Sequence, residues 1–215
     1  AIGSDTRIGN KFLNAGPGFG GSCFKKDILN LVYLCEYFDL PEVAEYWYKV
    51  IEVNEWQKFR ITNLITKKLF GTLFNKKLII LGFSFKSRTN DTRESPAISI
   101  CKNLLEEGAR LFIHDPKVNS EQIEKELGQK EITKYDNEFN ECGRWAKINN
   151  LNVSFNNADA VIILTEWEEY KEINWENCSK LMRKPSWVFD TRSVANQNEI
   201  KNMGINFWRI GDGTI

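Results

Sequence analysis

After Gly71 the sequence alternates between short apolar runs and longer amphipathic stretches, and this alternation constrains the fold more than any other feature. Each apolar run is short enough for a strand and is followed by a turn signal, such as Gly82 or Asp115-Pro116. Strands that alternate with helices pair in parallel, and parallel strands need burial on both faces. We therefore predict an α/β fold with a Rossmann-like parallel sheet.

The individual elements of this sheet follow from the same pattern. Strands are expected at 77–81, 110–114, 158–165, 186–190 and 205–210. Helices are expected at 96–107, 175–183 and 196–203. The polar segment 129–152 has no clear periodicity, and it is predicted to be an insertion or a long loop without chemistry of its own.

The residues before Gly71 predict two helices, one over 24–38 and one that begins at Pro41 and runs to about Phe70. The second helix has apolar residues on more than one side, interrupted by Asn54. A helix that is apolar on more than one side is buried on more than one side. We therefore expect either two domains or two subunits to meet along this helix.

A glycine-rich loop, 16–21, leads into the first helix and places Cys23 at the helix N-terminus. Glycine loses much entropy on ordering, so such a loop is expected where the backbone passes close to a ligand or adopts a positive φ. The helix dipole and the neighbouring Lys25 and Lys26 favour an anionic sulfur. The alternative is an ordinary turn before a helix, with the cysteine as a small buried hydrophobe.

The composition excludes several classes of protein. The 29 basic and 29 acidic residues balance, so the chain lacks the charge of a nucleic-acid binder. No apolar run is long enough to span a bilayer and the first residues form no signal peptide, so the cytoplasm is the expected location. Five scattered cysteines and the single His114 suggest neither a zinc site nor a disulfide framework, and Cys35 and Cys101 are expected in the core. The first residue is not a methionine, which indicates a fragment of a longer protein.

Cationic and aromatic side chains follow the predicted strands, where parallel sheets bind their ligands. Lys86 and Arg192 at strand ends suit a phosphate or diphosphate, and their aromatic neighbours suit a base or sugar. Solvated surface ion pairs are the alternative for both cations. The turn after the first strand, 82–87, lacks the Gly-x-Gly-x-x-Gly fingerprint, so a phosphate here would be held by side chains.

Five motifs occur in one characteristic order along the chain. They are Gly-Phe-Gly-Gly-Ser-Cys-Phe-Lys-Lys-Asp at 18–27, Gly-Phe-Ser-Phe-Lys at 82–86, Asp-Thr-Arg-Glu-Ser at 91–95, Asp115-Pro116 and Thr-Glu-Trp at 165–167. With these motifs the chain resembles, over nearly its whole length, the nucleotide-sugar dehydrogenases of the UDP-glucose 6-dehydrogenase type. The resemblance implies the C-terminal portion of such an enzyme, without its N-terminal NAD-binding domain. It also implies a partial helical dimerisation region at 1–70 and a UDP-sugar-binding domain at 71–215.

The activity implied by the resemblance is the oxidation of UDP-glucose to UDP-glucuronate by two hydride transfers to NAD. Cys23 would attack the aldehyde and carry the thiohemiacetal and thioester. Lys26 would lie on the cofactor side, and Asp27 would position or deprotonate water, unless Asp27 only compensates the helix dipole. No metal is implied, and the chain alone is expected to be inactive.

The resemblance also implies a set of binding residues. Contacts to UDP-glucose are expected from Arg7, Phe12, Asn14, Ala15, Gly16, Pro17, Gly18, Phe19, Gly20, Phe85, Lys86 and Arg192. Contacts to NAD are expected from Cys23, Lys26 and Arg93. Arg7 would reach into the site of a neighbouring subunit, and helix 41–70 would form the core of a homodimer or a higher oligomer.

Two departures from the family pattern affect the sugar-nucleotide contacts. Asn14 stands where close relatives carry a lysine, and Gly16-Pro17 replaces a less constrained pair. Two other functions therefore remain open on the sequence. One is a dehydrogenase for another nucleotide sugar, and the other is a non-catalytic module for UDP-sugar binding or oligomerisation.

Overall fold

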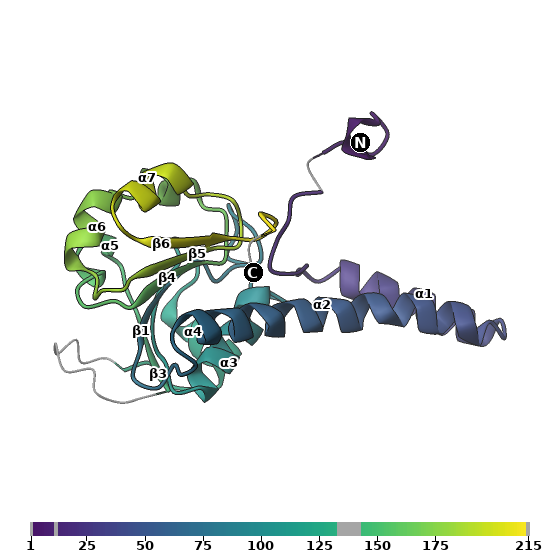
Figure 1. Ribbon diagram of the computed structural model, residues 1–215. Coiled ribbons are helices and arrows are strands. Elements are labelled where there is room, and N and C mark those ends of the chain that lie inside the picture. The colour runs from purple at the N-terminus through teal and green to yellow at the C-terminus, as the bar shows by residue number, and fades with distance from the viewer. Residues whose placement is uncertain (1, 11–12, 133–142, 214–215) are drawn as a thin grey trace.

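Six parallel strands form the centre of the computed structural model, which describes residues 2–10, 13–132 and 143–213 (Figure 1). In chain order they are β1 (Lys77–Leu81), β2 (Arg110–His114), β3 (Arg144–Lys147), β4 (Ala160–Ile163), β5 (Trp187–Asp190) and β6 (Asn206–Arg209). Their order in the sheet is β3-β2-β1-β4-β5-β6. The order reverses between β1 and β4, which is where open α/β sheets bind ligands. The predicted α/β fold with a parallel sheet is confirmed.

Helices cover both faces of the sheet (Figure 1). They are α1 (Phe24–Tyr37), α2 (Pro41–Lys68), α3 (Pro96–Glu106), α4 (Ser120–Leu127), α5 (Leu151–Ser154), α6 (Trp175–Leu181) and α7 (Gln197–Asn202), with 3-10 turns η1 (Ile2–Ser4) and η2 (Glu168–Glu172). One core cluster joins the sheet to α3, α4 and the end of α2. The other joins the opposite face to α5, η2, α6 and α7. Across the described residues, every helix is too short or too polar to cross a membrane.

The prediction of a loop over 129–152 is wrong, because β3 lies inside this segment. β3 pairs in parallel with β2, and its Trp145 and Ala146 are buried on opposite faces of the sheet. Its two end residues are charged, so the strand lacks the apolar run that revealed the others. Helix α4 was also not predicted, although Asn119 begins it with a capping box and Gly128 ends it in the left-handed conformation.

Helix α2 contacts both helix α1 and the core of the sheet. Its outer half packs against α1, and its inner half enters the core of the sheet through Ile61 and Ile65, which are at most 1% exposed. On other sides of the helix Tyr46, Trp56 and Phe59 remain more than half exposed, at 67%, 59% and 54%. The predicted helix from Pro41 to about Phe70 is confirmed, and the sheet covers one of its apolar sides. Burial of the other apolar sides against a second domain or subunit stays a prediction.

Candidate functional site

The carboxyl ends of β1 and β4 meet in close backbone contact. A Cβ atom on Gly82 would lie 2.3 Å from the Cβ of Thr165, and Gly82 has a φ of +94°, so only glycine fits. The Thr165 hydroxyl donates to the Ser84 carbonyl at 2.6 Å. These contacts bring the loop after β1 and the loop after β4 together at the point where the strand order reverses. We call this region the switch crevice.

Asp115, at the end of β2, occupies the backbone amides of the β1 turn. Its Oδ2 accepts hydrogen bonds from the N–H groups of Phe83 at 2.8 Å and Ser84 at 3.0 Å, and from Trp167 Nε1 at 3.3 Å. In a dinucleotide-binding fold, amides of this turn approach the pyrophosphate. Here a carboxylate already holds them. These two amides are therefore not free for a phosphate, and binding of a phosphate by side chains stays a prediction.

Arg192 is held rigidly over the switch crevice. Its Nε donates to the Leu164 carbonyl at 2.9 Å, its Nη2 donates to the Phe85 carbonyl at 3.3 Å, and Glu166 Oε2 lies 3.4 Å from Nε. Burial lowers the pKa of Arg192 and Glu166 opposes that shift, but an arginine keeps its charge at neutral pH. The exposed ammonium of Lys86 lies 5.2 Å from the centre of the Phe85 ring. The two predicted phosphate-binding cations therefore flank one residue, Phe85.

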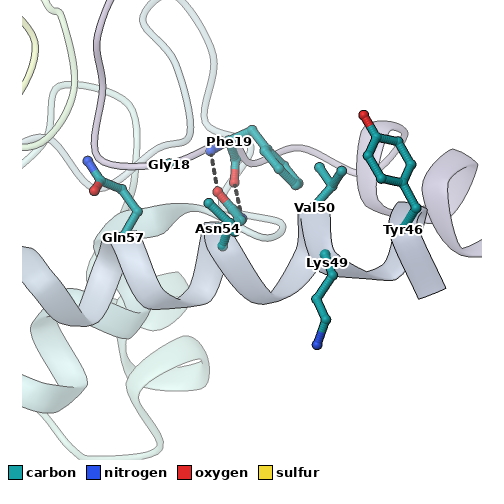
Figure 2. A pocket seen from close by; sticks show the side chains of 8 residues that line it. Gly18, Phe19, Tyr46, Lys49, Val50, Asn54 and Gln57 are labelled. Atoms are coloured by element: carbon teal, nitrogen blue, oxygen red, sulfur yellow. Dashed lines mark hydrogen bonds between the residues drawn. The ribbon is translucent and has the colours of Figure 1, made fainter.

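Asn54 of α2 holds one side of the glycine loop (Figure 2). The Phe19 N–H donates to Asn54 Oδ1 at 2.8 Å, and Asn54 Nδ2 donates to the Phe19 carbonyl at 3.2 Å. Gln57 Nε2 donates to the Gly16 carbonyl at 3.3 Å. At Gly18 a Cβ would lie 2.7 Å from Asn54 Oδ1. In the sequence Asn54 only interrupts the apolar pattern of the helix, and a polar residue at such a position signals that its side chain has a partner.

The other side of the glycine loop lies against the switch crevice. A Cβ on Gly16 would be 3.4 Å from Arg192 Nη1, and one on Gly20 would be 2.5 Å from the Glu94 carbonyl oxygen and 3.1 Å from Phe85 Cβ. Gly21 has a φ of +86° and donates its N–H to the Arg93 carbonyl at 2.9 Å. The loop therefore combines close approach with positive φ, the two reasons for which a glycine-rich loop was expected.

Cys23 is the N-cap residue of α1 and is exposed, with the Ser22 hydroxyl 3.8 Å from its sulfur. Cys35, Cys101 and Cys178 are buried, as predicted for the first two. The buried-hydrophobe alternative is therefore wrong for Cys23. Lys25, expected to act on the sulfur, binds Glu94 at 2.9 Å.

Comparison with known proteins then decides the family. The model for the UDP-binding domain of the UDP-glucose/GDP-mannose dehydrogenase family matches residues 79–197, and the model for the central domain of this family matches residues 1–56. The chain belongs to the UDP-glucose/GDP-mannose dehydrogenase family. UDP-glucose 6-dehydrogenase 4 of Arabidopsis thaliana is 45% identical over 98% of the chain, and UDP-glucose 6-dehydrogenase of Bos taurus is 48% identical over 98%.

A solved family member has the same fold. The UDP-glucose dehydrogenase of Pyrobaculum islandicum superposes with a TM-score of 0.70 at 28% identity, over 98% of this chain and 41% of that one. The chain likewise covers 45% of the Arabidopsis relative and 42% of the bovine one. It therefore spans less than half the length of these family members.

Several residues assigned from the family resemblance lie at the edge of the site. Arg7 is exposed and pairs with Asp5 at 2.8 Å, in an N-terminal segment that projects away from the sheet (Figure 1). Phe12 lies outside the described residues.

The remaining assigned residues differ in exposure. Asn14 and Ala15 are exposed, Pro17 is buried, and Lys26 and Asp27 are exposed in the first turn of α1. Arg93 is exposed and binds Asp91 through two hydrogen bonds of 2.9 and 2.7 Å.

A groove of about 430 Å³ lies between the glycine loop and the outer half of α2, beside the Asn54–Phe19 contact (Figure 2). It is lined by Gly18, Phe19, Tyr46, Lys49, Val50, Val53, Asn54 and Gln57. The surface that lines the groove is predominantly apolar, and Lys49 points away from the loop in this view. It extends the exposed apolar surface of α2 up to the loop that carries Cys23.

Proposed function

We propose that the chain is the C-terminal part of an NAD-dependent UDP-glucose 6-dehydrogenase, with a helical region at 1–70 and a UDP-sugar-binding domain at 71–215. One observation carries the proposal. The loop that leads to the exposed Cys23 lies, through Gly16 and Gly20, directly against Arg192 and Phe85 at the switch crevice. This arrangement provides a nucleophile beside a site for a charged ligand.

The sugar nucleotide would bind with its diphosphate near Lys86 and Arg192 and with its base or sugar near Phe85. Arginine and lysine are suited to phosphate oxygens, and the carbonyl contacts of Arg192 pre-set its orientation. Glucose is the proposed sugar because curated relatives at 43–48% identity are named UDP-glucose 6-dehydrogenases. Three solved structures named for other nucleotide sugars are 24%, 24% and 19% identical, so these three bear on the fold alone.

The residues described here fit NAD only at one edge of its site. Arg93 is two-thirds exposed and its guanidinium is paired with Asp91, whereas the β1 turn amides are occupied by Asp115. Arg93 and Lys26 would therefore contact a cofactor held mainly by residues outside this chain. NAD, when bound, supplies the hydride acceptor for each of the two oxidations.

Cys23 would make the second oxidation possible. An aldehyde has no carbinol hydrogen to lose as hydride until a nucleophile adds to its carbon. Addition of the Cys23 thiolate forms a carbon–sulfur bond and a thiohemiacetal, which becomes a thioester on losing a hydride and a proton. Water then cleaves the thioester to the carboxylate and restores the thiol. Asp27, exposed one turn into α1, would position that water or accept its proton.

A second copy of the chain is the proposed partner along α2, in a homodimer or a larger homo-oligomer. The exposed large apolar side chains of Tyr46, Trp56 and Phe59 support this, since burial of apolar surface drives association. Arg7, exposed on a projecting segment, would then reach the site of the neighbouring subunit. The cytoplasm is the proposed location, because the four cysteines within the described ranges are free thiols.

Calorimetry with UDP-glucose tests the binding half of the proposal. Arg192→Ala should weaken binding by roughly tenfold or more, since it removes a charge-assisted contact to phosphate. Arg183→Ala is the matched control: Arg183 pairs with Asp159 at 3.0 Å, before β4 at the opposite end of the sheet, and should leave binding unchanged. GDP-mannose should bind more weakly than UDP-glucose. Equal binding by the Arg192 variant would contradict the proposed site.

A further inference from the structure

Cys23 lies midway between two contacts to one segment of the sheet unit. Two residues before it, the Gly21 N–H donates to the Arg93 carbonyl at 2.9 Å. Two residues after it, the Lys25 ammonium donates to Glu94 Oε2 at 2.9 Å. Both acceptors belong to residues 91–95, which we call the strap. The cysteine is thus fixed on both sides to neighbouring residues of the same segment.

The strap is itself firmly attached to the switch crevice. Ser95 donates its hydroxyl to the Phe83 carbonyl at 2.8 Å and caps the N-terminus of α3. Glu94 has a φ of +55°, an uncommon conformation for a residue with a side chain, and its carbonyl lies against Gly20. A residue that contacts the strap is therefore also held in place relative to Phe85, Lys86 and Arg192.

Helix α1, which begins at Cys23, packs mainly against α2. The position of the thiol relative to the switch crevice therefore depends on the loop and on the two strap contacts. Of these, the Gly21 contact is made by backbone atoms, whereas the ion pair requires the side chains of Lys25 and Glu94. The hydrogen bond that Lys25 donates to Glu94 raises the pKa of Lys25, so its ammonium stays charged at neutral pH.

We propose that Lys25 and Glu94 are positioning residues, whose ion pair sets where the Cys23 thiol stands relative to a sugar bound at the switch crevice. The inference rests on the proposed function, because it takes Cys23 as the nucleophile. The two side chains are 32% and 43% exposed, so the pair contributes little to global stability. Its contribution is to alignment, on which the rate of an intramolecular attack depends steeply.

A purely electrostatic role of Lys25 on the sulfur makes a different prediction. In that case Lys25→Gln would disfavour the thiolate and Glu94→Gln would favour it, so the two variants would change the reactivity of Cys23 in opposite directions. A positioning role makes both variants act in the same direction. It also makes the double variant no worse than either single one, because each substitution already breaks the same contact.

Two alkylating probes on the chain separate these roles. A UDP-linked chloroacetamide would bind at the switch crevice, where the Cys23 thiolate would bond to its methylene carbon and displace chloride. Iodoacetamide reacts without a binding site. In Lys25→Gln and in Glu94→Gln, the maximal labelling rate with the UDP-linked probe should fall roughly fivefold at an unchanged half-saturating concentration. Reaction with iodoacetamide should change by less than about twofold. The charge-swapped pair Lys25→Glu with Glu94→Lys should restore much of the lost rate.

Lys180→Gln is the matched control, because it breaks a comparable ion pair, to Glu176 at 2.7 Å, on the remote α6. It should label like the parent chain. An unchanged maximal rate in either strap variant, or opposite effects of the two variants, would overturn the positioning role.

Amide hydrogen exchange tests the ion pair without any nucleotide. Exchange in the peptide covering residues 19–27 should become faster in both strap variants and stay the same in Lys180→Gln. Equal exchange in the parent chain, both strap variants and Lys180→Gln would overturn the inference, even if labelling by the UDP-linked probe saturates. Failure of the UDP-linked probe to saturate in the parent chain would instead count against the proposed function, and exchange would still decide on the ion pair.

Discussion

The side-chain amide of Asn54 and the backbone of Phe19 are hydrogen-bonded in both directions, at 2.8 and 3.2 Å, across 35 residues of sequence. This is the pairing that a neighbouring strand would offer, supplied by one side chain of a helix. It satisfies both polar groups of a loop residue that has no regular secondary structure. The conformation of the loop that leads to Cys23 therefore depends on α2 as much as on the glycines of the loop.

Replacing Asn54 with alanine should lower the free energy of unfolding by about 1–3 kcal/mol, because it leaves the N–H and carbonyl of Phe19 without their partners. Urea unfolding of the chain measures this change. Asn30→Ala, at an exposed position on α1, is the control and should have a much smaller effect. Equal stability of both variants would show that water replaces Asn54 at no cost.

Gly20→Ala should destabilise the chain by about 1–3 kcal/mol, since the new Cβ cannot fit against rigid backbone. It would lie 2.5 Å from the Glu94 carbonyl oxygen. Gly16→Ala is a matched control in the same loop, because its Cβ would lie at an ordinary 3.4 Å from Arg192 Nη1. If thermal unfolding ranks the two variants the other way, the observed approach of the loop to the strap is incorrect.

Iodoacetamide at neutral pH should alkylate Cys23 before Cys35, Cys101 and Cys178. Cys23 is exposed and the other three are buried. Burial also raises the pKa of Cys101 strongly and that of Cys178 to about 12, so these thiols stay protonated. Peptide mass spectrometry over a time course gives the order. Earlier labelling of any of the three buried thiols would contradict the exposed-nucleophile assignment.

The stability of the chain should fall as the pH drops below about 6.5, in part through His114. Burial lowers the pKa of His114 from its ordinary 6.5, Lys147 acts in the same direction, and Asp115 opposes it. The unfolded chain therefore binds this proton at a higher pH than the folded chain, which costs stability until the folded pKa is passed. The Tyr170 hydroxyl at 3.1 Å and Glu169 at 3.6 Å also face the ring.

His114→Phe isolates this contribution, since it keeps an aromatic ring that cannot titrate. Urea unfolding at about pH 7.5 and about pH 5.5 should show a smaller loss of stability in the variant than in the parent. The comparison between the two proteins removes the effect of carboxylates such as Glu169, which titrate in both. Identical losses would mean that His114 is not the group responsible.

Cys23→Ser, placed in a full-length dehydrogenase that contains this chain and the proposed NAD-binding half, should abolish formation of the carboxylate. A serine hydroxyl is far less ionised than a thiol, so the covalent adduct would not accumulate. Chromatographic assay of the acid measures this, with Cys35→Ser as a control at a buried position. Undiminished acid formation would exclude the covalent route.

Much of the fold was predictable because its strands carry local signals. β1 and β2 match the predicted ranges residue for residue, since each is an apolar run followed by a turn. β3 has only two buried residues between charged ones, and its pairing with β2 is what makes it a strand. Asn119 and Gln122 form a capping box that marks the start of α4, but the polar sequence around them obscures this signal.

The candidate site was predictable where its chemistry is concentrated in one loop. The position of Cys23 before α1 follows from the glycines and the helical pattern that comes after them. Asn54 is marked by its polar place in an apolar pattern, but the partners of Asn54 and Glu94 could not be predicted, because the contacts to Phe19 and Lys25 bridge 35 and 69 residues. Such contacts depend on how the helices and the sheet come together, and no local pattern encodes them.

The spacing of residues along helix α2 fixes the position of the loop relative to the sheet. Asn54, which holds the loop, and Ile61, which enters the sheet core, are seven residues apart, or nearly two turns, so both face the same side. One residue inserted between them would rotate Asn54 by about 100° relative to the sheet. The loop would then lose either its helix partner or its place at the switch crevice. The spacing within α2 is therefore under a stricter constraint than most of its individual side chains.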